Sequence, residues 1–432
     1  MPDPPAAAQP TAGGRLLLHG WRHPAVLAAT ALSVAAGFAQ FSVFAALGDV
    51  AQAFGQSGGT GVAGELGLSA STLGVGLGII RLAALGGLPL SAYADRRGRR
   101  RVLLWCAGLG LVCTAAAALS PGFWVFVALF ALARPLLSAT NAVVTVIASE
   151  ETAASDRAKA IALVTAGYGI GAGLTGIVRG VAGQALGFRG LFALTLLPVA
   201  CLPLLARWIR EPDRFRQLKP PPGQLGLGAV HRDVLARLLL IAFLGGIASF
   251  VATPVNGYIF AYAENVLGLS ARVTALVVVA AAPTGLGGLL VGRWAADALG
   301  RRWTCVVMHV VVGLAGILTY SGSAPRAICG YLLALFGGAV YAPAVGALSA
   351  EIFPTSERAT AAGWMTAASA LGAVAGLVAF GLLADALEGF ALAATLVSLP
   401  VMLTAVLYLR LPETRGLELE ESAPEPRPAV GL

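Results

Sequence analysis

Two polar motifs of this chain occur twice, about two hundred residues apart, and almost everything between them is apolar. Asp95–Arg100, which reads DRRGRR, is repeated as Asp297–Arg302, which reads DALGRR, at an offset of 202 residues. Glu150–Ala158 is repeated as Glu351–Ala359, at an offset of 201 residues. Two unrelated motifs with nearly one offset indicate that a whole half of the chain was duplicated. Duplicated hydrophobic halves are typical of secondary transporters whose site lies between them.

The composition predicts a membrane protein. Of the 432 residues, 57% are hydrophobic and 12% are charged, whereas about a quarter of the residues in soluble domains are charged. A bilayer is crossed by about 20 apolar residues. Twelve stretches satisfy this length, at 25–48, 69–93, 102–120, 122–148, 158–180, 188–208, 234–255, 270–295, 303–321, 325–349, 359–384 and 389–409. We therefore expect an all-α membrane protein with 12 transmembrane helices in two six-helix bundles.

The net charge of +8 is a topology signal, because Lys and Arg collect in loops on one side of the predicted membrane. This bias predicts a multi-pass protein of the cell membrane, in contact with lipid and not nucleic acid, with both termini cytoplasmic. The expected parts are a disordered cytoplasmic N-terminal tail (1–24), a first bundle (25–208), a cytoplasmic linker (209–233), a second bundle (234–409) and a cytoplasmic C-terminal tail (410–432).

Catalytic and metal sites find no support in the sequence. The five cysteines lie in apolar runs without metal-ligand or CxxC spacing, and the four histidines are scattered. No pair of acidic residues lies inside a predicted span, so the groups that an active site needs are missing. We expect no enzyme activity, no metal and no cofactor.

The duplicated loops contain the residues of a predicted cytoplasmic gate. A carboxylate at a helix end beside several guanidinium groups forms charge-assisted pairs and caps a neighbouring helix N-terminus. Glycine allows the tight turn between two helices. The alternative is that these arginines only fix the topology, but the duplicated spacing favours a gate that holds the halves together while the site opens outward. The candidate gate residues are Asp95, Arg96, Gly98, Arg99, Glu150, Arg157, Asp297, Gly300, Arg301, Glu351, Arg358 and Glu413.

The loop from Asp95 to Arg100 resembles the D-R-x-G-R-R/K motif of the major facilitator superfamily, and the resemblance covers essentially the full length. EIFPTSERAT at 351–360 and PETRG at 412–416 resemble loops of its sugar and metabolite porters, and REPDRF at 210–215 is a degraded form of a third porter motif. The resemblance implies alternating access. It also implies that Glu150, Glu351 and Glu413 pair with loop arginines such as Arg99, Arg157, Arg301 and Arg358.

These features predict a monomeric secondary transporter of a small organic solute, such as an organic anion or a sugar, with protons as a candidate coupling ion and symport as the expected mode. A drug or secondary-metabolite efflux antiporter is the alternative, although the glycine-rich stretch at 169–176 lacks the Gly-Pro of drug antiporters. A non-transporting membrane sensor is a further alternative, and the short tails argue against it.

Arg81 and Arg134 are the clear charges inside predicted spans, where charge is costly and therefore indicates function. In the superfamily an Arg at the fourth-helix position is linked to coupling and to the cavity, so Arg134 is the leading candidate. Arg81 has an alternative role in bonding backbone carbonyls or reaching the membrane surface. No Asp or Glu lies deep in a span to carry a proton, and two unpaired guanidinium groups would suit an anionic substrate.

Further polar side chains fall at plausible cavity positions. Tyr258 and Tyr262 fit an interfacial aromatic belt equally well, and His309 is expected to be a packing residue. The candidate cavity residues are Gln40, Arg81, Arg134, Asn141, Asn256, Tyr258, Tyr262 and Tyr341.

Overall fold

The computed structural model describes residues 20–55, 61–211, 232–354 and 358–417. Within these ranges twelve helical stretches are long and apolar enough to cross a membrane, which confirms the expected all-α fold. They are Pro24–Ala45, Ala70–Arg97, Arg99–Leu119, Phe123–Glu151, Lys159–Ala182, Ala185–Trp208, Val234–Val266, Ala271–Ala298, Arg301–Thr319, Ala324–Glu351, Ala361–Ala386 and Phe390–Arg410. Most of the predicted N-terminal tail, linker and C-terminal tail lies outside the described residues, so the predicted domain boundaries stay predictions.

The described part of the first half contains nine α-helices and two short 3-10 turns. These elements are α1 (Pro24–Ala45), α2 (Leu47–Phe54), α3 (Gly61–Leu66), α4 (Ala70–Ala83), η1 (Ala84–Gly86), α5 (Gly87–Arg97), α6 (Arg99–Ala116), η2 (Ala117–Leu119), α7 (Phe123–Glu151), α8 (Ala154–Ala193) and α9 (Leu196–Trp208). Of these, α2 and α3 lie between the first and second spans, and one span is assembled from α4, η1 and α5. Helix α8 continues from the fifth span into the sixth and contains a break near the start of the sixth, at Gly187, whose φ is 56°.

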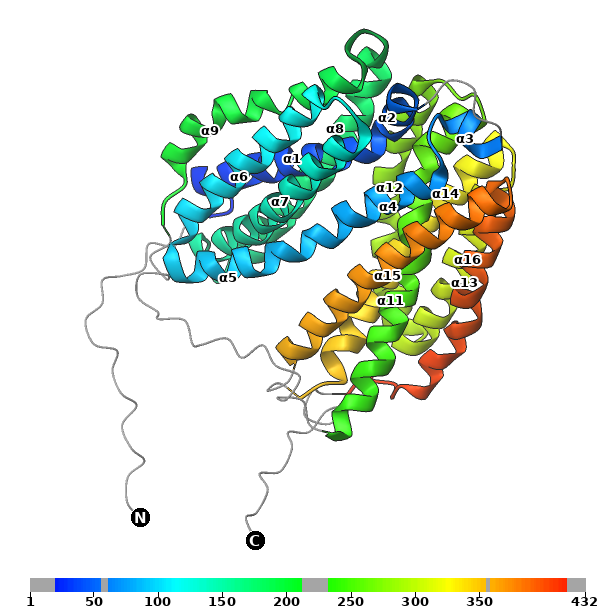
Figure 1. Cartoon of the computed structure of the whole chain (residues 1–432). Helices are drawn as coiled ribbons and strands as arrows, with labels where there is room; N and C mark the ends of the chain where they lie inside the picture. Colours follow the sequence, from blue (N-terminus) through cyan, green and yellow to red (C-terminus); the bar gives the residue numbers. More distant parts are fainter. Residues whose placement is uncertain (1–19, 56–60, 212–231, 355–357, 418–432) are drawn as a thin grey trace, which may run out of the picture.

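The last six spans are arranged in the same order. Their elements are α11 (Arg232–Ala261), the π-helical turn η4 (Tyr262–Val266), α12 (Ala271–Ala298), α13 (Arg301–Thr319), α14 (Ala324–Glu351), α15 (Arg358–Ala386), α16 (Phe390–Thr404) and the 3-10 turn η5 (Ala405–Arg410). In Figure 1 α1, α5, α6, α7 and α9 lie on one side of the molecule and α11, α13, α15 and α16 on the other, while α3 lies beside the second half.

Close helix packing in both halves depends on glycine. A Cβ at Gly171 of α8 would collide with the backbone oxygen of Val34 in α1, and a Cβ at Gly372 of α15 would collide with that of Gly246 in α11. Small residues let helix backbones approach in this way, which is how helices associate in a membrane without a hydrophobic driving force between them. The duplicated halves thus share their tightest helix contact as well as their loops.

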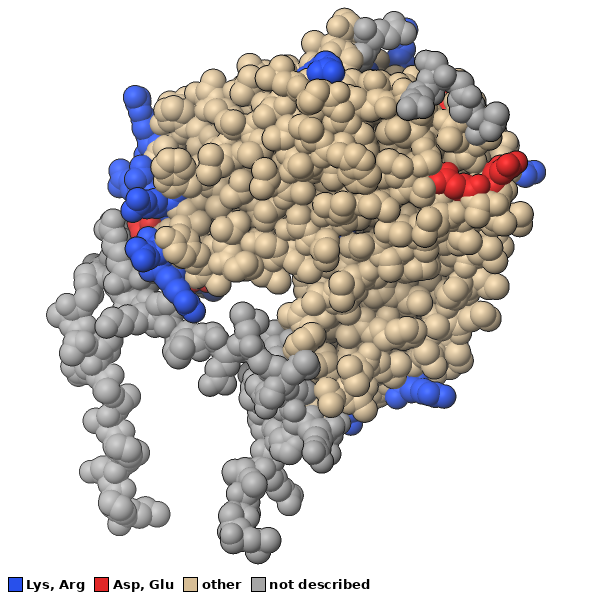
Figure 2. Space-filling view, viewed as in Figure 1, with Lys and Arg blue, Asp and Glu red and all other residues tan. Residues whose placement is uncertain are grey.

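The two halves touch mainly through α4 with α15 and through α8 with α12. These contacts lie toward one face of the membrane, because they involve the first turns of α4 and the last turns of α15, as where Gly381 meets Ala70. Toward the other face, where the described chain begins and ends, the halves part, and Figure 2 shows the resulting hollow between them. The central space is therefore open toward the face that contains the loops at Asp95 and Asp297. Asp95 lies at the end of the second span and Asp297 at the end of the eighth, and these two spans cross the membrane in the same direction. The two acids therefore lie on the same face.

Candidate functional site

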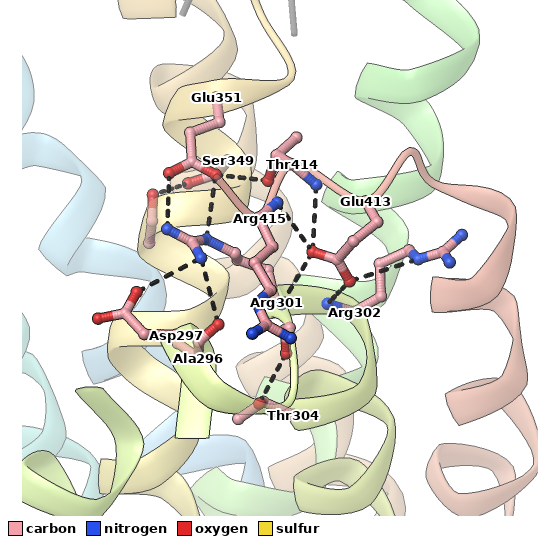
Figure 3. A network of polar contacts seen from close by, with 12 residues as sticks. Ala296, Asp297, Arg301, Arg302, Thr304, Ser349, Glu351, Glu413, Thr414 and Arg415 are labelled. Carbon is pink, nitrogen blue, oxygen red and sulfur yellow. Dashed lines mark hydrogen bonds and ion pairs between the residues drawn. The ribbon is translucent and has the colours of Figure 1, made fainter. Parts of the chain in front are cut away.

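Arg301 in the first turn of α13 is the centre of a polar network on the open face (Figure 3). Its Nη1 lies 3.4 Å from Asp297 Oδ1, and its Nε lies 3.3 Å from Glu351 Oε2. The backbone N–H groups of Arg301 and Arg302 donate to the two carboxylate oxygens of Glu413, at 3.0 and 3.2 Å. Glu413 therefore caps α13, where the partial positive charge of a helix N-terminus stabilises a carboxylate.

The first half contains the same arrangement around Arg99. This side chain pairs with Asp95, at 3.1 Å, and is in short contact with Glu150. The Glu211 carboxylate accepts from the N–H groups of Arg99, at 2.6 Å, and Arg100, at 3.0 Å. Glu211 thus occupies the position of Glu413, 202 residues earlier. Sequence reasoning left Glu211 out of the gate residues, although the repeat offset was the signal that would have found it.

All of these contacts join helices of one half, and we call the two sets the inner networks. Glu150 meets Arg99, and Glu351 meets Arg301, as the resemblance implied. Arg157 donates its Nε to Ser149 O at 3.0 Å, Arg96 is exposed, and the side chain of Arg358 lies outside the described part. A role in holding the two halves together stays a prediction, because the halves are parted on this face.

On the opposite face an ion cluster joins the two halves. Arg179 of α8 is 6% exposed and binds Asp49 of α2 with two hydrogen bonds, at 3.2 and 2.7 Å. It also pairs with Glu264 of the second half, which accepts a hydrogen bond from Thr274 Oγ1 at 2.6 Å. Glu264 lies on η4, and π-helical turns are frequent at functional sites. We call Asp49, Arg179, Glu264 and Thr274 the outer ion cluster.

A second contact across the halves lies on the same face. The Asp385 carboxylate of α15 accepts from the N–H groups of Ala70 and Ser71, both at 2.8 Å, and so caps α4 of the other half. Tyr258 donates its hydroxyl to Ala70 O at 2.7 Å. Neither Arg179 nor Asp49 was singled out from the sequence, although both lie at or beside the ends of predicted spans. The charges at these span ends were the available signal.

Arg134 of α7 and Arg81 of α4 lie in mid-span and act on each other electrostatically. Arg134 has a hydrogen bond with Tyr168 of α8. In the described part of the chain neither guanidinium has an ion-pair partner, and Arg134 Nε, Gln40 Nε2 and Asn141 Oδ1 are buried without a protein partner. Leaving such a group unpaired costs about 1–3 kcal/mol. These atoms are therefore candidates for hydrogen bonds with a bound molecule.

The second half encloses a cavity of about 460 Å³. Its lining comes from α11, α13, α14, α15 and α16, and includes the predicted residues Asn256 and Tyr341 together with His309. The other two predicted tyrosines lie elsewhere. Tyr258 is fully buried at the contact between the halves, and Tyr262 accepts a hydrogen bond from the N–H of Gly322 at 3.0 Å.

The turns before α6 and α13 allow a test of the inner networks. Gly98 and Gly300 have φ of 109° and 97°, and a Cβ would lie 3.2 Å from Glu211 Oε2 and 2.7 Å from Glu413 Oε2, respectively. We expect Gly300→Ala to lower the apparent Tm of the purified protein more than Gly98→Ala does. Backbone strain contributes about 1–2 kcal/mol at each position, and the tighter approach to Glu413 adds to it.

Gly285→Ala is the matched control, because Gly285 is helical and has no atom within 4 Å of its Cβ position. This change should leave the apparent Tm unchanged or raise it, since alanine favours helix. Equal melting of all three variants would contradict the structural role of the two turns.

The family model described as Major Facilitator Superfamily matches residues 29–337 and 272–432. The gallate transporter of Pseudomonas putida is 26% identical over 385 residues, which is 80% of this chain and 84% of the relative. The cis,cis-muconate transport protein of Acinetobacter baylyi is 27% identical over 336 residues, 74% of this chain and 80% of the relative.

Two further matches extend the comparison. The transcription regulatory protein OpdE of Pseudomonas aeruginosa is 29% identical over 315 residues, 69% of this chain and 75% of the relative. Among solved structures, the inward-open xylose transporter of E. coli superposes with a TM-score of 0.71 at 18% identity, covering 92% of this chain and 98% of the other. At this identity the structural match shows the fold alone.

Proposed function

The chain belongs to the major facilitator superfamily, and on this premise we propose that its solute is a small organic anion with at least one carboxylate group. The protein is a secondary transporter that moves a small organic solute across the membrane by alternating access. The observation that carries the proposed substrate class is the pair of mid-span guanidinium groups, Arg81 and Arg134, which have no carboxylate partner in the described chain. The names of two relatives, which carry muconate and gallate, support the same class.

Electrostatics favours an anion over a sugar at this site. Two like charges at membrane depth repel each other and are costly to desolvate. A carboxylate neutralises one of them and accepts two parallel hydrogen bonds from a planar guanidinium, which a sugar hydroxyl does not do. Gln40, Asn141 and Tyr168 add neutral hydrogen-bonding groups from α1, α7 and α8. The first half thus offers charge compensation and orientation to a bound acid.

The placement of charge supports the proposed orientation in the cell membrane. Lys and Arg crowd the face on which the halves part, as Figure 2 shows, and basic residues favour the cytoplasmic side. We therefore place both termini in the cytoplasm and interpret the structure as open to the inside. In this orientation the outer ion cluster closes the external face, and it has to separate before a solute can enter from outside. A monomer is sufficient, because both halves of the site come from one chain.

Uptake into proteoliposomes tests the substrate class. We expect radiolabelled benzoate, gallate or cis,cis-muconate to accumulate, whereas the methyl esters of these acids, which lack the negative charge, should neither enter by this route nor compete. Repeating the assay with and without an inward proton gradient determines whether protons are coupled to transport. Transport of xylose or of a cationic drug without transport of any carboxylate would reject the anion proposal, and the second outcome would favour the efflux alternative.

A further inference from the structure

The cavity of the second half is lined by an imidazole with one unpartnered nitrogen. His309 of α13 is 2% exposed, and its Nε2 is buried without a hydrogen-bond partner. The same side chain lines the cavity of about 460 Å³, a volume within the range of small-molecule sites. The equivalent positions of the first half are Ala107 and Gly108. This polar group therefore belongs to one half only.

The hydrogen bond on the other side of the ring assigns the tautomer of His309. The imidazole is hydrogen-bonded to the backbone of Leu244 in α11. The N–H groups of a helix interior are already used within the helix, so the partner is the Leu244 carbonyl oxygen and the ring nitrogen Nδ1 donates to it. A neutral imidazole has one donor and one acceptor nitrogen. With the proton on Nδ1, the unpartnered Nε2 is a hydrogen-bond acceptor.

Neighbouring rings hold the imidazole in place. The rings of Tyr341 and Tyr408 lie 5.3 and 4.9 Å from it, centroid to centroid. Their two hydroxyl groups are 2.6 Å apart and hydrogen-bonded to each other. Tyr408 is fully buried, so a rotation of the imidazole would disturb this cluster. Because the imidazole of His309 is held in place, its acceptor nitrogen favours a ligand whose hydrogen-bond donor lies at one particular position.

The rest of the lining is uncharged. It combines the amide of Asn256 and the hydroxyls of Ser249 and Ser369 with aliphatic and thioether side chains such as Met308 and Met365. A carboxylate has no compensating cation here, and its oxygens cannot donate a hydrogen bond to Nε2. An uncharged, partly apolar part of a ligand that carries an O–H group can pack against this lining and donate a hydrogen bond to Nε2.

We propose that this cavity binds the uncharged body of the solute and that His309 Nε2 accepts a hydrogen bond from a hydroxyl group on that body. The inference rests on the proposed function, in which the guanidinium groups of the first half take the carboxylate. The substrate class narrows to carboxylic acids that also carry a hydroxyl. An acid without the hydroxyl leaves the buried acceptor unpaired, and sites built around a hydrogen bond discriminate strongly against ligands that lack it.

Equilibrium binding to the purified full-length protein tests this, with benzoate and its 3-hydroxy, 4-hydroxy and 3,4,5-trihydroxy derivatives titrated by calorimetry. We expect at least one hydroxylated acid to bind about tenfold more tightly than benzoate, as one hydrogen bond to a buried acceptor allows. His309→Leu should remove this preference while benzoate still binds. His309→Gln, which can place an amide oxygen near the position of Nε2, should restore part of it.

Val307→Leu is the matched control, since Val307 lies next to this part of α13, is exposed and does not line the cavity, and it should keep the preference. If wild-type protein binds all four acids equally, or if His309→Leu keeps the preference, the inference is overturned while the proposed function stands. If His309→Leu does not fold, the affinities of the wild-type protein for the four acids still test the inference. If the wild-type protein binds none of the acids, the proposed substrate class fails together with the inference.

Discussion

Arg134→Met is expected to weaken the binding of carboxylates by about 100-fold or more, because removing one partner of a buried charged pair costs about 2–5 kcal/mol. Arg134 lies at mid-span and is acted on by the like charge of Arg81, which a bound carboxylate would offset. Arg134→Lys should fall between wild type and Met, since it keeps the charge and loses the planar fork that binds a carboxylate bidentately. Calorimetry with benzoate or gallate, followed by proteoliposome uptake, measures both effects.

Arg81→Met distinguishes two roles that Arg81 could have beside Arg134. If Arg81 also binds the anion, its loss weakens binding; if it only raises the local positive potential, the loss is smaller than that of Arg134→Met. Arg326→Met is the matched control, because Arg326 is exposed and its removal changes the net charge equally. Unchanged carboxylate binding in both Arg81→Met and Arg134→Met would reject the anion site.

Arg179→Met is expected to open the external face. Asp49 and Glu264 would then face each other across the two halves without the guanidinium that joins them. Breaking a buried ion pair by removing one partner costs about 3–5 kcal/mol, and a change of this size shifts the balance between inward-open and outward-open states by about 100-fold or more. Arg179→Lys should have a smaller effect, since lysine keeps the charge but cannot bind Asp49 through two nitrogens.

Cysteine accessibility measures this shift. With the five native cysteines replaced, Ala275→Cys places a thiol on α12 beside Gly180 of the other half, at the outer contact. We expect a membrane-impermeant maleimide added outside to label this thiol faster in the Arg179→Met protein. Adding Asp49→Asn and Glu264→Gln should slow the labelling again, because no unpaired charge then remains in the outer ion cluster. Equal labelling with and without Arg179 would show that this cluster does not hold the face closed.

Several features followed from the sequence because they depend on local properties. Each span is recognised by its own apolar length, since the bilayer acts on every segment separately. Arg81 and Arg134 were found because a charge inside an apolar run is conspicuous without knowledge of its neighbours. The pairing of Glu351 with Arg301 was implied by the family resemblance of the loops that contain them, although the two residues are 50 positions apart.

Other features depend on how helices rotate and meet. Tyr258 was considered for the cavity, but the rotation of α11 places its hydroxyl against Ala70 of the other half. His309 was expected only to pack, and the arrangement of α11, α13 and α14 gives it an unpartnered nitrogen at a cavity. Successive side chains of a helix point about 100° apart, so the composition of one span cannot say which of them faces a neighbour.

The sequence alone determined that this chain crosses a membrane twelve times as two related halves, because apolar length and a repeated motif are properties of the chain itself. Only the tertiary structure decided which face is closed and by what. Arg179 and Glu264 are 85 residues apart, and Asp385 and Ala70 are 315 residues apart. Contacts over such separations form only when whole bundles pack, and the energy that closes one face lies in those contacts and in no single segment.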